Sequence, residues 1–67
     1  MDATDKKYCV AVNRNDFLGI KKGNIYEYSC DYDKYGTYYI VYTRQEYNWF
    51  GHEDMFNECF VKYKPTV

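Results

Sequence analysis

Three cysteines and the single histidine are the first candidates in this sequence for a structural metal site. They are Cys9, Cys30, His52 and Cys59. Structural zinc sites use pairs of ligands a few residues apart, such as Cys-x-x-Cys, because one tight turn must offer two ligands at once. The sequence contains no such pair. We therefore expect no metal ion and no cofactor. We interpret the odd number of cysteines as reduced thiols, since secreted disulfide frameworks use even numbers.

Nucleophilic catalysis would need a cysteine, a histidine and an orienting carboxylate held together. His52 is followed by Glu53 and Asp54, but adjacent residues on one short turn point in different directions. A chain of 67 residues also offers no second lobe with which to form a cleft. We therefore expect a protein without enzyme activity and without a small-molecule substrate.

Aromatic side chains in or beside loops are the candidates for binding a protein partner. They are Tyr32, Tyr35, Tyr47 and Trp49. Tyrosine and tryptophan give a large contact area at small side-chain entropy cost and are enriched at interface hot spots. The alternative is that these aromatic residues are structural. In that case the barrel uses tyrosine as its ordinary strand residue, with the hydroxyl groups reaching solvent at the edge of the core. The pattern leaves both interpretations open.

Three basic residues form the candidate contact for nucleic acid, namely Arg14, Lys21 and Lys22. Together with stacking aromatic side chains they could bind a single strand, as small barrels do through cationic grooves and aromatic platforms. Asp16 and Asp31 lie in neighbouring loops, and the net charge of the chain is −1. A solvated surface of mixed charge is the competing interpretation, so nucleic-acid binding is the alternative function.

The composition predicts an all-β protein. Aromatic residues make up 22% of the chain, with ten tyrosines. Such side chains fit the pleated, half-buried surface of a sheet. The length predicts one domain, residues 1–67, with frayed ends at 1–6 and 64–67. A domain of this size hides about 60% of the surface of its unfolded chain, which leaves little room for a deep internal cavity.

Alternation of apolar and polar residues predicts five strands and one helical turn. The strands are expected at residues 7–13, 24–30, 37–43, 48–50 and 59–63, with the helical turn at 52–57. Between the first two strands, Leu18 and Ile20 are apolar anchors, and Gly23 is expected at positive φ in a turn. The segment 37–43 should lie in the middle of the sheet, because it would aggregate if it were exposed.

The same alternation predicts which side chains face the core. In the segment 37–43, Tyr38, Ile40 and Tyr42 are expected to point inward, and Tyr39 and Val41 outward. The expected shared core consists of Tyr26, Tyr28, Ile40, Phe50 and Val61.

The run Leu18-Gly19-Ile20-Lys21-Lys22-Gly23-Asn24, with Tyr26 and Tyr28 after it, resembles the diverging turn of Src-homology-3-type barrels. The order of expected elements over residues 7–63 is similar to that family, which implies a small five-stranded antiparallel Src-homology-3-like barrel. Within it the chain looks most like small barrels encoded by bacteriophages and bacterial mobile regions. The segments that carry this likeness are 23–28, 38–41, Trp49-Phe50 and Phe56. The aromatic motifs that bind Pro-x-x-Pro ligands in eukaryotic members are missing from the matching regions, so that activity is not implied.

These observations favour a non-enzymatic protein-binding module. The resemblance implies a phage-encoded inhibitor or adaptor that acts on a host protein. The partner is expected to be a host protein or a second copy of the chain, paired through the edge of the last strand. The sequence has no apolar run long enough to cross a bilayer and no leader at residues 1–5, so we expect no membrane contact and a cytoplasmic location, in the bacterial host if the protein is phage-encoded.

Overall fold

The computed structural model describes residues 6–43 and 46–64. The strands are β1 (Lys7–Ala11), β2 (Ile25–Asp33), β3 (Gly36–Tyr42), β4 (Trp49–His52) and β5 (Phe60–Tyr63), and the helix is α1 (Glu53–Cys59). The strands form one antiparallel sheet in the order β4-β3-β2-β1-β5. The predicted all-β class, with five antiparallel strands and a short helix before the last one, is confirmed.

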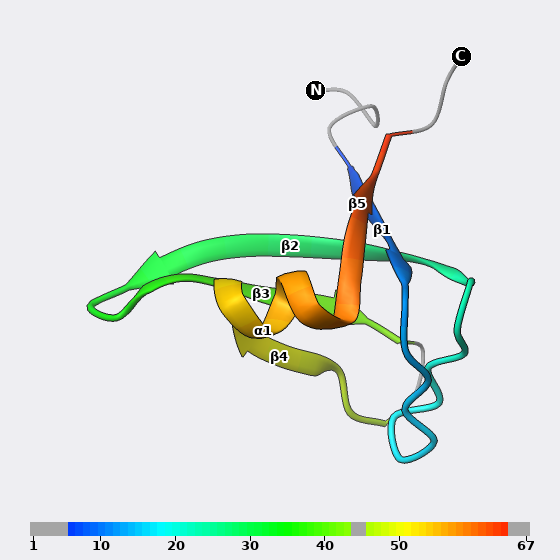
Figure 1. Ribbon diagram of the computed structural model, residues 1–67. Coiled ribbons are helices and arrows are strands. Elements are labelled where there is room, and N and C mark those ends of the chain that lie inside the picture. The colour runs from blue at the N-terminus through cyan, green and yellow to red at the C-terminus, as the bar shows by residue number, and fades with distance from the viewer. Residues whose placement is uncertain (1–5, 44–45, 65–67) are drawn as a thin grey trace.

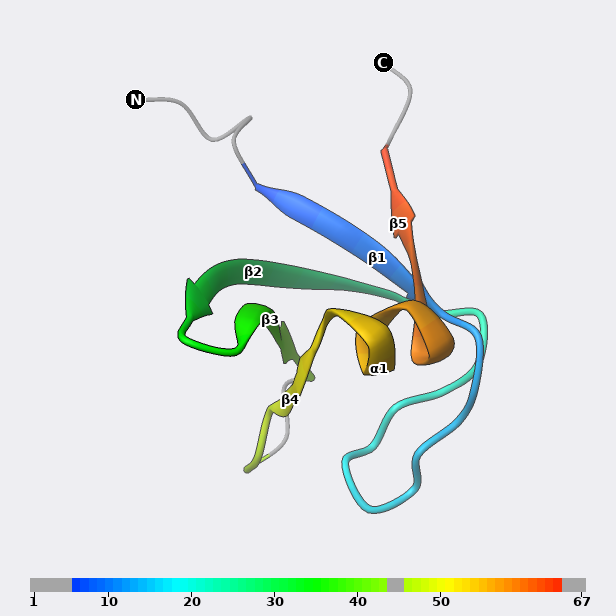
Figure 2. The same cartoon turned by 60° about the vertical axis from the view of Figure 1, so that its left-hand side comes forward.

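The sheet curls into a half-barrel around α1 (Figures 1 and 2). The helix packs against β3, β4 and β5, so it fills the concave side. β4 and β5 are the two edges of the sheet, and α1 joins them along the chain. β3 pairs with β2 on one side and β4 on the other, which confirms the expected place of segment 37–43 inside the sheet. This architecture is consistent with a small Src-homology-3-like barrel.

The helix is longer than the predicted turn at 52–57. Its last residue is Cys59, which we had expected at the start of the last strand. Phe56 is buried and Cys59 packs against the core, and residues three apart share one face of a helix. A helical rather than extended backbone at Cys59 therefore turns both side chains toward the sheet. β4 likewise continues through Gly51, where the sequence predicted its end.

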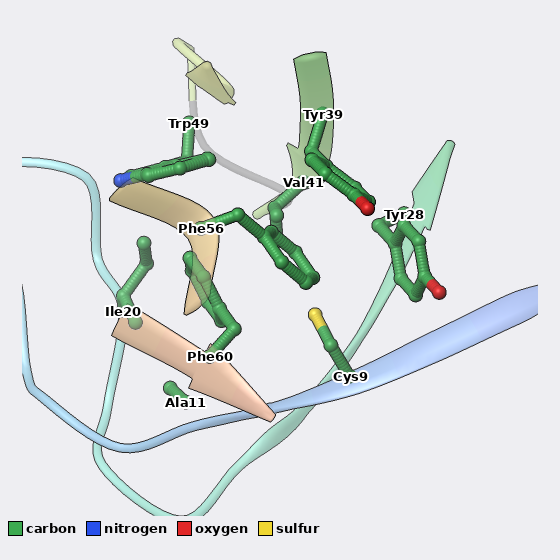
Figure 3. Close-up of a cluster of buried hydrophobic side chains, with 9 residues drawn as sticks. All are labelled: Cys9, Ala11, Ile20, Tyr28, Tyr39, Val41, Trp49, Phe56 and Phe60. Atoms are coloured by element: carbon green, nitrogen blue, oxygen red, sulfur yellow. The ribbon is translucent and has the colours of Figure 1, made fainter. Parts of the chain in front are cut away.

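The core is built mainly from aromatic rings (Figure 3). Its buried members are Cys9, Ala11, Ile20, Tyr28, Tyr39, Val41, Trp49, Phe56 and Phe60. Phe56 of α1 lies in the middle, with its ring centroid 4.0 Å from that of Tyr39 and 5.2 Å from that of Tyr28. Ile20 is buried and Leu18 packs against the core, so both expected anchors of the long loop are confirmed.

The prediction of which β3 side chains point into the core is wrong. Tyr39 and Val41 are buried, whereas Ile40 is half-buried and Tyr42 is 40% exposed. Both faces of this strand are apolar, so its own alternation cannot choose between them. The choice is made by pairing, because Val41 lies opposite both Tyr28 and Trp49 and must share their face of the sheet.

The predicted core is therefore only partly correct. Tyr28 is buried and Tyr26 packs against the core, but Phe50 is 58% exposed and Val61 is 55% exposed. In each of these two strands the neighbouring residue takes the inward position. These neighbours are Trp49 and Phe60. Adjacent strand residues point to opposite faces, so an error of one residue exchanges the core residue for the surface residue.

Gly23 has φ of +90°, as predicted for the turn before β2. Its N–H donates to the Ala11 carbonyl oxygen at 2.8 Å, and the Asn24 N–H donates to the Lys21 carbonyl oxygen at 3.1 Å. The first bond ties the turn to the end of β1, and the second closes the turn itself.

Gly23→Ala is expected to lower the free energy of unfolding by about 1 kcal/mol. A Cβ atom at this position would meet nothing within 4 Å, so the whole cost is the positive φ. Urea denaturation would measure the change, with Lys22→Ala in the same turn as the control. An alanine variant as stable as the natural protein would contradict the assigned turn.

Candidate functional site

The side of the sheet opposite α1 carries a broad set of apolar side chains, which we call the outer face. Strand pairing assigns to it Tyr8, Val10, Ile25, Tyr38, Ile40, Tyr42, Phe50, Val61 and Tyr63. Five of these side chains are between 40% and 58% exposed, namely Ile25, Tyr42, Phe50, Val61 and Tyr63. Contiguous apolar surface of this kind marks interaction sites more often than scattered single residues do.

Strand register arranges these side chains in rows across the sheet. The rows are Val61-Val10-Ile25, Tyr63-Tyr8-Glu27-Tyr42 and Ser29-Ile40-Phe50. Directly opposite residues on paired strands have Cβ atoms about 4.5–5.5 Å apart. The outer face is therefore a continuous surface, held in place by backbone hydrogen bonds of the sheet.

An aromatic cluster occupies the end of the outer face near the β2–β3 hairpin. The ring centroids of Tyr38 and Phe50 are 5.0 Å apart, and the His52 ring meets both edge-on at 6.1 and 6.3 Å. His52 Nε2 lies 3.2 Å from the nearer carboxylate oxygen of Asp33. The pKa of Asp33 is lowered, mainly by the hydrogen bond its carboxylate accepts from the Tyr35 N–H at 2.8 Å and less by His52. Asp33 is thus ionised at neutral pH.

A groove of about 690 Å³ lies at the other end of the outer face. Its walls include Tyr8, Ile25, Glu27 and Tyr42 from the strands, and Gly19 and Lys21 from the long loop. The loop is fixed to the sheet by the Lys21 N–H, which donates to the Tyr26 hydroxyl at 2.9 Å. The lining is mostly polar, with hydroxyl, carboxylate and ammonium groups, which suits hydrogen bonding with a ligand.

The four predicted loop aromatics are not brought together. Tyr32 and Tyr35 are 71% and 76% exposed at the hairpin tip. Tyr47 is 57% exposed and stacks on Phe17, with ring centroids 6.1 Å apart. The length of β3, about 20 Å at the usual rise per residue, separates Tyr47 from the hairpin tip. The surface position predicted for Trp49 is wrong, because this side chain is 7% exposed and belongs to the core.

The predicted cations lie on the long loop. Arg14 forms an ion pair with Asp16 at 3.9 Å, and both side chains are largely exposed. Lys21 and Lys22 are exposed, and Lys21 lines the groove. Nucleic-acid binding through these residues stays a prediction, but it has lost Trp49 as a stacking residue.

The three cysteines are free thiols in different surroundings. Cys9 is buried, and burial raises its pKa to about 12. Cys59 is partly buried, and burial raises its pKa as well, while Cys30 is exposed. In the ranges 6–43 and 46–64, no group of three or more histidine, cysteine, aspartate and glutamate residues is placed to hold a metal ion.

Sequence reasoning missed the outer face because it placed Ile40 and Phe50 in the core. One local signal could have corrected the facing of β4. Trp49 and Gly51 point to the same side, and a Cβ atom on Gly51 would come within 2.6 Å of the Trp49 ring. A large ring lying over a glycine two residues away indicates a tightly packed face.

No helix among the described residues has the length and apolar character needed to cross a membrane. No protein-family model matches this chain, and no curated protein or solved structure is significantly similar to it.

Proposed function

We propose that this chain is a non-enzymatic protein-binding module and that the outer face is its binding surface. The observation that carries the proposal is the set of exposed apolar side chains in two rows of this face, above all Phe50 in one row and Val61 and Ile25 in the other. Full burial of such a side chain contributes about 1.5–3 kcal/mol, and because these are half-buried already, a partner that covers them gains about half of that for each.

The chemistry of the surface also suits a protein partner. Protein interfaces combine an apolar centre with a polar rim and are enriched in aromatic side chains. Here Ile40 and Phe50 form an apolar part of the face on β3 and β4, while Glu27 and Asp31 supply charge beside it on β2. A sheet holds these side chains rigidly, so little ordering entropy is lost on binding.

The phage origin and the role as inhibitor or adaptor of a host protein rest on the resemblance of the sequence alone. The cytoplasmic location is an expectation from the apolar pattern of the sequence, and only its assignment to a bacterial host rests on the resemblance. These remain predictions, and the choice of a bacterial lysate for the first experiment follows from them.

Phe50→Ala is expected to reduce capture of a specific protein from bacterial lysate at least about tenfold, because truncating an exposed aromatic anchor removes a hot spot. The matched control is Met55→Ala, which truncates an apolar side chain that is 53% exposed on α1, on the other side of the sheet. Mass spectrometry of the captured proteins, with circular dichroism to verify folding, provides the measurement.

Capture that survives Phe50→Ala, or that Met55→Ala abolishes equally, would place the binding surface elsewhere. Failure of the natural protein to capture any protein would count against the proposed function itself.

A further inference from the structure

Carboxylates follow β2 along the outer face. Glu27, Asp31 and Asp33 occupy outward positions of this strand. All strand residues lie in the described part of the chain, and none of the outward positions holds lysine or arginine. The two strand lysines, Lys7 and Lys62, have the register of the inward face. The strands therefore present negative charge next to an apolar surface.

Two of these carboxylates adjoin an aromatic ring on β3. Glu27 lies opposite Tyr42, and Asp31 lies opposite Tyr38. An arginine or lysine side chain can lie over a ring while its charged group reaches a neighbouring carboxylate. Each pair thus offers the two contacts that a cationic side chain uses in recognition.

Both carboxylates keep an oxygen that can accept such a cation. One oxygen of Asp31 already accepts the Tyr32 N–H at 2.8 Å, and Glu27 shares the wall of the groove with Lys6 and Lys21. Within the described residues, neither Glu27 nor Asp31 forms an ion pair, in contrast to Asp33, which contacts His52. Glu27 is half-buried between its neighbours, so a charge placed against it is less screened by water than on an open surface.

Midway between the two pairs, the neighbouring strands β3 and β4 supply apolar side chains. Ser29 lies opposite Ile40, which in turn lies opposite Phe50. The Ser29 hydroxyl is hydrogen-bonded to the Tyr42 hydroxyl at 2.9 Å, so its polar group is already paired. Glu27 and Asp31 are four residues apart on one strand, a separation of about 13 Å.

We infer that the outer face binds an extended segment of a protein partner that carries basic side chains at positions i and i+4 and an apolar side chain at i+2. In an extended segment these three side chains project from the same face with the spacing of Glu27, Ser29 and Asp31. The basic groups meet the two carboxylate and ring pairs, and the apolar group meets Ile40. This inference rests on the proposed function and names the class of partner.

A second copy of the chain fits this face less well. The sheet curls around α1, so the outer face is convex (Figure 2). Two convex faces touch over a small area, whereas a stable dimer buries about 800 Å² on each partner. A single extended segment can follow the direction of β2 along the curved surface.

The test is an NMR titration of the whole protein with the peptide Thr-Arg-Thr-Leu-Thr-Arg-Thr, capped at both ends and used at millimolar concentration. The control peptide, Thr-Arg-Arg-Leu-Thr-Thr-Thr, has the same composition but the wrong spacing. We expect amide shifts concentrated on β2, β3 and β4, and weaker binding of the control peptide.

Glu27→Gln and Asp31→Asn should each weaken binding of the first peptide by about two- to fivefold, as for one exposed charge pair. Asp54→Asn on α1 removes a carboxylate from the other side of the sheet and should leave the affinity unchanged. Added salt should weaken binding to the natural protein more than to Glu27→Gln.

The inference would be overturned by no shifts at all, by equal affinity for both peptides, by affinity indifferent to Glu27→Gln and Asp31→Asn, or by preferential binding of a DNA single strand to this face. Light scattering that shows a dimer, lost in Phe50→Ala, would also overturn the inference and would identify a second copy of the chain as the partner. The lysate capture with Phe50→Ala is independent of these charges, so it can succeed while the inference fails.

Discussion

Replacing Phe56 with alanine is expected to lower the free energy of unfolding by about 3–5 kcal/mol. The side chain is fully buried, and its ring contacts those of Tyr28, Tyr39, Trp49 and Phe60, with the centroid of Tyr39 4.0 Å away (Figure 3). Phe56 packs α1 against β2, β3, β4 and β5. A small movement of one of these elements therefore cannot fill the cavity that the truncation leaves. A domain of this size has a total stability of only about 3–10 kcal/mol.

Urea denaturation followed by near-ultraviolet circular dichroism measures this loss. The matched control is Phe50→Ala, the same chemical change at a side chain that is 58% exposed, for which we expect a loss below about 1 kcal/mol. Equal losses at the two positions would mean that β4 and α1 are not packed as described.

Trp49→Ala is also expected to cost about 3–5 kcal/mol, because this residue belongs to the core. Its ring lies edge-on to that of Phe60 at 5.1 Å and to that of Phe56 at 6.1 Å. The same ring covers Gly51, which has no side chain that could fill the space left when the ring is removed. Because the variant is expected to be destabilised, a loss of partner binding by Trp49→Ala would not identify Trp49 as a contact residue.

The control for Trp49→Ala is Tyr47→Ala, two residues earlier in the chain. Tyr47 is 57% exposed and contacts Phe17 on the surface, so we expect a change below about 1 kcal/mol. Thermal unfolding and amide dispersion in NMR spectra distinguish the two variants. A Trp49→Ala protein that melts like the natural one would restore Trp49 as a surface candidate.

The number and order of the elements could be predicted because they depend on local signals. Gly23 marks a turn that few other residues can form, and the tyrosine-rich segment before Thr43 has strand character at every position. Each signal lies within a few residues and does not depend on where the rest of the chain goes.

The facing of the strands could not be predicted in the same way. Ile40 and Val41 are equally good strand residues and equally apolar, and only the register with β2 and β4 decides which one is buried. The same ambiguity affected Trp49 and Phe50. Since the candidate site is one face of the sheet, this choice decided the site as well. The exposure of Tyr32 was predicted correctly because a hairpin tip has no core to enter.

The half-barrel is closed by side chains rather than by a backbone ladder. β4 and β5 lie at opposite edges of the sheet, and α1, seven residues long, spans the distance between them. Parting these edges would expose Phe56 and Phe60 but would leave the ladders among β1, β2 and β3 intact. The molecule therefore has a seam along which it can open without complete unfolding. The amides around Glu27 and Tyr28, the two β2 positions paired with both β1 and β3, should be the last to exchange with solvent.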